Sequence, residues 1–192
     1  MLFRSAPNEP YDYVILGASH AAVLDFEDMN ERLQKLCSKR VINLSVQGGG
    51  PVVNRLLLDY FLAQRSTRNV IYVVDAFAFH RRDWNEDRLN DAKLYARAPF
   101  DLTLAKLLLD SPASTKTVID YTTGFSKINN PDRFKPDVTD DETLKFRKTY
   151  RPVEQIERQR IDYLYPKTID KQLTERYLAD FERLARDLRQ RG

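Results

Sequence analysis

The stretch "VILGASHAAV", residues 14 to 23, passes from an apolar run to a helical pattern at Gly17, and this transition decides the fold class. The run "YDYVILG" (11 to 17) is rich in branched apolar residues and follows Pro10, which is typical of a buried parallel strand. Apolar residues at spacings of three and four then predict one amphipathic helix over residues 20 to 37. The chain therefore begins with a strand that leads directly into a helix.

The same alternation continues through the next forty or so residues. "RVINLSV" (40 to 46) predicts a second strand that ends in "QGGGP", and a helix is expected to begin near Pro51. "NVIYVVDAF" (69 to 77) predicts a third strand. The order βαβαβ with short connections predicts an α/β domain with a parallel sheet, a strand order beginning 2-1-3, and helices on both faces.

The second half of the chain is less regular. Residues 84 to 112 have a helical pattern interrupted at Pro99, and 116 to 124 fit either a short strand or a continued helix. Residues 126 to 150 fit an irregular loop. An amphipathic helix then runs from Leu173 to the end, where Gly192 fits a helix C-cap. We expect a single domain over 1–192, with its core in 11–80 and a helical and irregular extension in 81–192; whether the domain ends at Gly192 or continues beyond it stays open.

Composition excludes several classes of function. Thirty-one basic and 28 acidic residues give a formal charge of only +3 without a long block of one sign, so no nucleic-acid partner is expected. A lone cysteine, Cys37, expected to be a small buried side chain, excludes an internal disulfide, and with only His20 and His80 no metal site is expected. No glycine motif for a dinucleotide or a nucleoside triphosphate is present, and no cofactor is expected.

The sequence also contains no apolar run of the ~20 residues that a membrane span needs. The N-terminal "MLFRSAPNEPYDY" has no apolar core of the kind found in a signal peptide. These features predict a cytoplasmic protein as the chain is written, and an extracytoplasmic one if the N-terminus is incomplete.

Three polar features follow the three predicted strands. Ser19 comes after the first strand, the Gly48–Gly50 turn after the second, and Asp75 at the end of the third. Carboxyl ends of parallel strands meet at one edge of a sheet, which is where open α/β sheets place their ligand sites. A serine at the start of a helix suits two roles, a nucleophile whose oxyanion is held by free backbone N–H groups or a plain N-cap.

"YVILGASHA" and "INLSVQGGGP", together with the βαβαβ beginning, resemble the SGNH (GDSL-like) hydrolases, especially the bacterial branch in which Gly-x-Ser is followed by His. The resemblance covers roughly residues 11 to 80. It implies a three-layer, flavodoxin-like domain and a serine esterase or O-acyltransferase acting on a small-molecule or polysaccharide ester. It also implies Ser19 as the nucleophile, with the N–H groups of Ser19 and of Gly48 or Gly49 holding the oxyanion.

The chain departs from the family pattern at two places. The Gly-x-Asn-Asp motif after the third strand is replaced by "VVDAFAFH", and the Asp-x-x-His near the family's C-terminus has no counterpart, because no histidine follows His80. Three explanations stay open: the chain is the N-terminal part of a longer hydrolase, Asp75 and His80 form a triad with Ser19, or the protein is a catalytically inactive relative that binds a ligand or serves in assembly. His20 is expected to steady the turn by a hydrogen bond.

Two further expectations concern the surface. Arg81 and Arg82 lie near the predicted site and suit either an anionic substrate or a solvated charged face. A sheet of three or four strands leaves an exposed edge, and the apolar stripe of the last helix needs a cover. We therefore expect a homo-oligomer unless residues 116 to 122 cap the sheet.

Overall fold

The computed structural model describes residues 9–96, 98–128 and 154–190. Its centre is a parallel sheet of three strands in the order β2-β1-β3. The strands are β1 (Tyr11–Leu16), β2 (Val41–Asn43) and β3 (Thr67–Tyr72). In the register, Val14 lies opposite Ile42 on one side and Val70 on the other. The predicted α/β class and the strand order 2-1-3 are confirmed.

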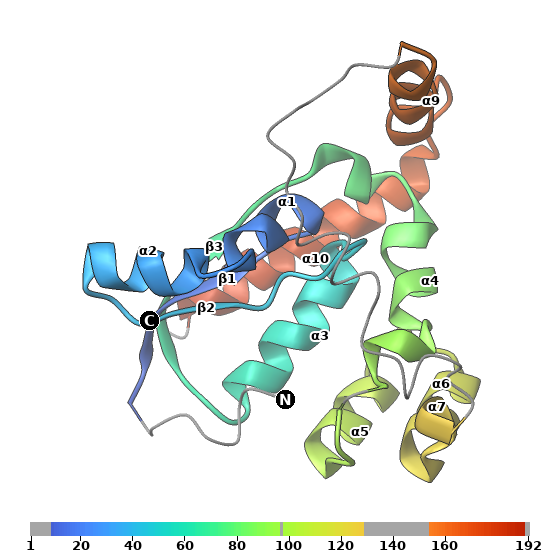
Figure 1. The fold of residues 1–192 in the computed structure, drawn as a ribbon. Helices are drawn as coiled ribbons and strands as arrows, with labels where there is room; N and C mark the ends of the chain where they lie inside the picture. Colours follow the sequence, from blue (N-terminus) through green and yellow to red (C-terminus); the bar gives the residue numbers. More distant parts are fainter. Residues whose placement is uncertain (1–8, 97, 129–153, 191–192) are drawn as a thin grey trace.

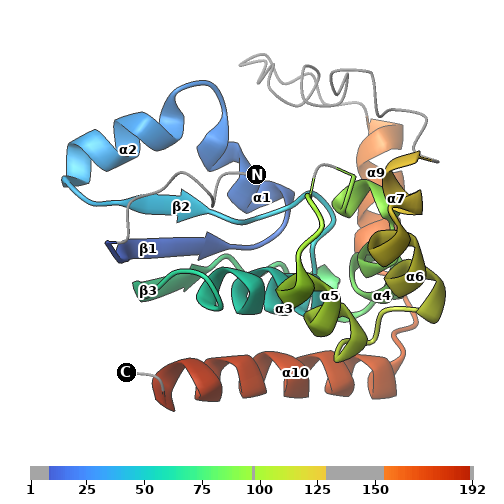
Figure 2. The ribbon, with the colours of Figure 1, turned by 90° about the horizontal axis from the view of Figure 1, so that it is seen from below.

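Helices cover both faces of this sheet (Figure 1 and Figure 2). One face carries α1 (Ser19–Ala22) and α2 (Met29–Cys37), and the other carries α3 (Pro51–Leu62) and α10 (Lys171–Gln190). Side chains of β1 alternate between the two layers: Ile15 packs in the cluster of Ala21, whereas Val14 and Leu16 pack in the cluster of Leu184. The fold therefore has three layers, with the most buried strand in the middle.

The single helix expected over 20–37 is wrong. The chain forms α1, a 3-10 turn η1 (Val23–Asp25) and then α2, because Phe26 adopts an extended conformation and Glu27 has a φ of 51°. Of the apolar residues on either side of this break, Leu33 packs partly buried against the cluster of Ile15, whereas Leu36 is 84% exposed. Cys37 is also exposed rather than buried. Spacing alone does not reveal a turn that contains neither glycine nor proline.

The extension consists of short helices. Their bounds are η2 (Ala76–Phe79), η3 (Arg82–Trp84), α4 (Glu86–Leu89), η4 (Ala92–Leu94), α5 (Leu102–Leu109), α6 (Thr115–Thr123), α7 (Phe125–Ile128) and α9 (Glu154–Leu164). The ambiguous segment 116–124 is thus helical, with Ser114 Oγ capping its first turn and Gly124 ending it in the left-handed conformation. It adds no strand to the sheet. Most of the predicted loop 126–150 and Gly192 lie outside the described residues.

The extension is joined to the three-layer core through α10. Glu86 of α4 is buried and bonds both Arg176 and the Tyr177 hydroxyl of α10. Tyr177 itself lies in a core cluster with Leu89, Leu108 and Tyr121. Charge pairing and apolar packing therefore fix α10 on both the sheet and the extension. Among the described helices, none has the length and apolar character that crossing a membrane requires.

Candidate active site

Ser19 lies where β1 ends, as the first residue of α1. The turn needs Gly17, whose φ is +149° and whose added Cβ would lie 2.8 Å from Ala21 Cβ and 3.0 Å from the Val73 carbonyl oxygen. Ala18, not Ser19, occupies the N-cap position, and no side chain caps the helix. The helix-cap interpretation of Ser19 is therefore wrong, and its hydroxyl has no hydrogen bond within the part of the chain that the structure describes.

His20, the next residue, is held by Asp75. The distance from His20 Nδ1 to Asp75 Oδ1 is 2.6 Å, and the side chains are 65% and 10% exposed, respectively. A carboxylate only accepts hydrogen bonds, so this contact assigns the proton to Nδ1. Nε2 is then the nitrogen that can accept a hydrogen bond or a proton. The second oxygen of Asp75 is buried and has no partner among the described residues. Asp75 is thus placed to orient one imidazole.

His80, the other histidine, lies elsewhere. Its Nδ1 is 3.1 Å from Thr174 Oγ1 of α10, and no contact with Asp75 or Ser19 is found within the described residues. The pairing of Asp75 with His80 considered from the sequence is not formed. Asp75 pairs with His20 instead, and the turn-steadying hydrogen bond expected of His20 is this one.

The glycine turn after β2 offers one available N–H group. Gly49 N donates to the Val46 carbonyl at 2.9 Å, and Gly50 N donates to the Trp84 carbonyl at 2.6 Å. Gly48, with φ +72°, has no backbone N–H bond to another described residue. The N–H of Ser19 is likewise unpaired there, as expected in the first turn of a helix. Of the two glycines that the sequence nominated, Gly48 is the one with a donor to spare.

Two fully buried asparagines fix these turns. Asn54 of α3 accepts from Gly17 N at 3.0 Å and donates to the carbonyls of Gly49 and Gly50, both at 2.9 Å. Asn85 accepts from Val52 N and donates to the carbonyls of Ala78, within η2, and of Arg81, just before η3. Sequence reasoning missed both residues. For Asn54 a signal existed, since an asparagine within the apolar run "PVVNRLLL" must find buried partners.

The arginines near the site are mostly engaged. Arg81 Nη1 donates to the Tyr163 carbonyl at 2.8 Å, and Nη2 donates to Asp83 at 2.7 Å. Arg88 Nε donates to the Gln47 carbonyl and so braces the glycine turn. Arg82 is exposed and forms no ion pair with a described residue. Of the two arginines expected to bind an anion, only Arg82 is therefore free to do so.

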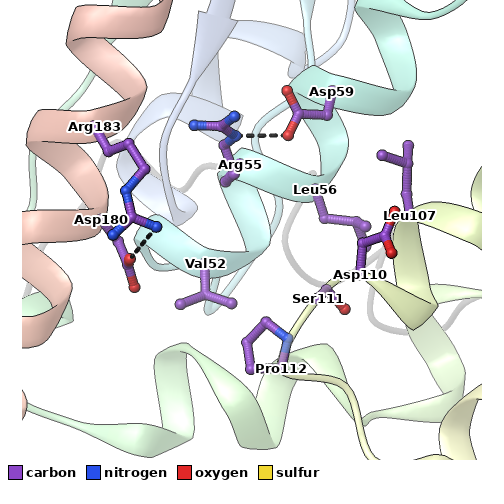
Figure 3. A pocket seen from close by; sticks show the side chains of 10 residues that line it. All are labelled: Val52, Arg55, Leu56, Asp59, Leu107, Asp110, Ser111, Pro112, Asp180 and Arg183. Carbon is purple, nitrogen blue, oxygen red and sulfur yellow. Dashed lines mark hydrogen bonds and ion pairs between the residues drawn. The ribbon is translucent and has the colours of Figure 1, made fainter.

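Two cavities formed by described residues lie apart from this site. One, of about 320 Å³, lies between α3, α10 and the connection from α5 to α6 (Figure 3). It is lined by Val52, Arg55, Leu56, Asp59, Leu107, Asp110, Ser111, Pro112, Asp180 and Arg183. Another, of about 250 Å³, lies beside Tyr95 and Ser126. Neither is lined by Ser19, His20 or Asp75. These three residues define the candidate site because of their chemistry.

Comparison with known proteins does not place the chain in a family. No protein-family model, no curated protein and no solved structure matches it. Function therefore has to be argued from the geometry of Ser19, His20 and Asp75 at the carboxyl ends of the strands.

Proposed function

We propose that Ser19, His20 and Asp75 catalyse acyl-ester hydrolysis or O-acyl transfer. The observation that carries this proposal is the 2.6 Å contact between His20 Nδ1 and Asp75 Oδ1, in which the Asp75 side chain is only 10% exposed. The residue that precedes His20 is Ser19, whose hydroxyl has no partner among the described residues. A histidine oriented by a carboxylate is the usual base for a serine nucleophile. The resemblance of the first motifs to SGNH hydrolases supports the same chemistry.

Each group has one role in the proposed reaction. Ser19 Oγ attacks the ester carbonyl carbon, and its proton passes to His20 Nε2. Asp75 keeps Nδ1 protonated and stabilises the imidazolium that forms. The N–H groups of Ser19 and Gly48 donate to the tetrahedral oxyanion. The C–O ester bond then breaks, His20 returns the proton to the leaving alkoxide, and water or an acceptor hydroxyl removes the acyl group from Ser19.

Adjacent residues constrain how the proton travels. Consecutive side chains on an α-helix point about 100° apart, and no hydrogen bond joins Ser19 Oγ to His20. In our proposal the proton therefore passes through one bridging water, a separation that general-base catalysis tolerates. The 65% exposure of the His20 side chain leaves room for this water.

A second candidate is a non-catalytic binding or assembly protein that has kept the turn geometry. The absence of a direct Ser19–His20 hydrogen bond favours it. In that case Asp75 and His20 serve only to fasten the carboxyl end of β3 to α1. The two candidates differ in one measurable property, which is the reactivity of the Ser19 hydroxyl.

Labelling with a fluorophosphonate probe tests the proposal. Intact mass and peptide mapping should place one adduct on Ser19 in the wild type and none in Ser19→Ala. His20→Gln should slow labelling about 100-fold or more, the contribution of a positioned general base. His80→Gln is the matched control, since it alters the only other histidine, and should label at the wild-type rate. A folded wild type that takes no label overturns the proposal in favour of a binding protein.

A further inference from the structure

Aromatic side chains from three separate segments gather beside His20. The ring of Phe77, in η2, has its centre 6.1 Å from that of His20, 4.7 Å from that of Trp84 and 6.1 Å from that of Tyr165. We call Phe77, Trp84 and Tyr165 the aromatic corner. Phe77 is its hub, because it contacts the histidine of the candidate site on one side and both other rings as well.

The rings of the corner meet at steep angles. Phe77 lies at 62° to Trp84 and at 84° to Tyr165. Phe77 is buried, Trp84 is half-buried and Tyr165 is 53% exposed. Such rings form walls of a corner and not one flat platform. The rings touch edge to face, so the space between them is filled, and the exposed parts of Trp84 and Tyr165 form an angled apolar surface. Such a surface suits an alkyl chain or an aromatic ring, whereas a saccharide ring stacks on one open aromatic face.

Polar contacts hold the end of α9 against η3. The Arg81 guanidinium lies 4.0 Å from the centre of the Tyr163 ring and donates to the Tyr163 carbonyl, while the Tyr163 hydroxyl donates to Asp83. Tyr165 follows two residues later, so these contacts fix its ring near Phe77. The corner is therefore built by tertiary contacts between residues about eighty positions apart in the sequence.

We propose that the aromatic corner binds the acyl group of the substrate, and that the substrates are esters of medium-chain aliphatic or arylacetic acids rather than acetyl esters. This inference rests on the proposed function, because the acyl chain starts at the carbon that Ser19 attacks. The exposed parts of Trp84 and Tyr165, which pack on the ring that contacts His20, then continue the site away from the carbonyl.

Trp84 makes the binding step measurable without catalysis. It is the only tryptophan of the chain. Fluorescence excited at wavelengths that tryptophan absorbs and tyrosine does not therefore reports on the corner alone. Ser19→Ala, which cannot form an acyl-enzyme, is titrated with methyl octanoate, methyl phenylacetate and methyl acetate. The first two should change the Trp84 emission in a saturable way, and methyl acetate should not.

Two variants locate the effect. Tyr165→Ala removes an exposed ring, which leaves the fold intact, and should weaken methyl octanoate binding about fivefold, as expected for the loss of one aromatic contact. Phe100→Ala is the matched control, because Phe100 is 51% exposed and stacks on Tyr121 instead. It should leave binding unchanged.

The outcomes separate this inference from the proposed function. Saturable binding of the longer esters by a protein that no fluorophosphonate labels supports the corner and refutes the catalytic proposal. Labelling of Ser19 without saturable binding of either longer ester refutes the corner and leaves the catalytic proposal standing. Equal binding by Tyr165→Ala and the Ser19→Ala parent, or a response to an oligosaccharide only, also overturns the inference.

Discussion

Replacing Asn54 by leucine should uncouple the two turns that form the candidate oxyanion site. The Asn54 side chain is fully buried and is the only described link that bonds both the Gly17 amide and the carbonyls of the glycine turn. Leucine has the same branched shape, but its methyl groups are larger and form no hydrogen bond. The substitution therefore removes the bonds, and the methyl groups also have to move away from atoms that lie 2.9 to 3.0 Å from the amide.

The cost follows from the groups left without partners. Gly17 N–H, the Gly49 carbonyl and the Tyr72 hydroxyl lose their bonds to Asn54, whereas the Gly50 carbonyl keeps its bond from the Asn54 backbone. Three unsatisfied groups cost about 1 to 3 kcal/mol each. Burying the leucine side chain returns about 1.5 to 3 kcal/mol. We expect a net loss of about 3 kcal/mol in the free energy of unfolding, or a fall of about 6 to 12 °C in Tm.

Urea denaturation followed by circular dichroism measures this loss. Asn69→Leu is the control, because Asn69 is an exposed asparagine whose side chain also makes one backbone contact, to the Asp12 carbonyl at 3.0 Å. It should change stability by about 0.5 kcal/mol or less. If Asn54→Leu loses no more than about 1 kcal/mol, water or backbone rearrangement satisfies the two turns, and the coupling role of Asn54 is refuted.

Two further predictions concern backbone strain and alkaline stability. Gly17→Ala should lose about 2 to 4 kcal/mol, since its Cβ would overlap Ala21 Cβ, whereas Gly124→Ala should lose about 1 kcal/mol, because Gly124 has φ +83° with nothing within 4 Å. Equal losses in urea melts would refute the close approach at Gly17. Burial raises the pKa of the Tyr72 and Tyr95 hydroxyls above their value in the unfolded chain. Their contribution is therefore complete below about pH 10 and is lost as the pH rises further, so the urea midpoint should fall there, and less steeply in Tyr95→Phe.

Local patterns in the sequence predicted the regular part of the fold. The branched run around Val14 and the Pro51 helix start lie where expected, because strand burial and helix initiation depend on neighbouring residues. The break at Phe26 and Glu27 could not be predicted in this way. Phe26 is extended and Glu27 has a positive φ, and neither residue type signals a turn.

The candidate site was only partly predictable. The topology rule brought Ser19, the glycine turn and Asp75 to one edge of the sheet, but it did not say which histidine Asp75 would meet. That choice depends on where η2 directs the chain after Asp75: His80 is carried to Thr174 of α10. The aromatic corner depends on contacts between η2, η3 and the segment after α9, which no local pattern encodes.

A double-mutant cycle on the rate of fluorophosphonate labelling measures whether Asp75 acts on Ser19 through His20. The rate is measured for the wild type, His20→Gln, Asp75→Asn and the double variant. We predict that the double variant labels no more slowly than His20→Gln, because Asp75 has no imidazole left to orient. Independent reductions that multiply in the double variant would contradict it and would separate Asp75 from the reactivity of Ser19.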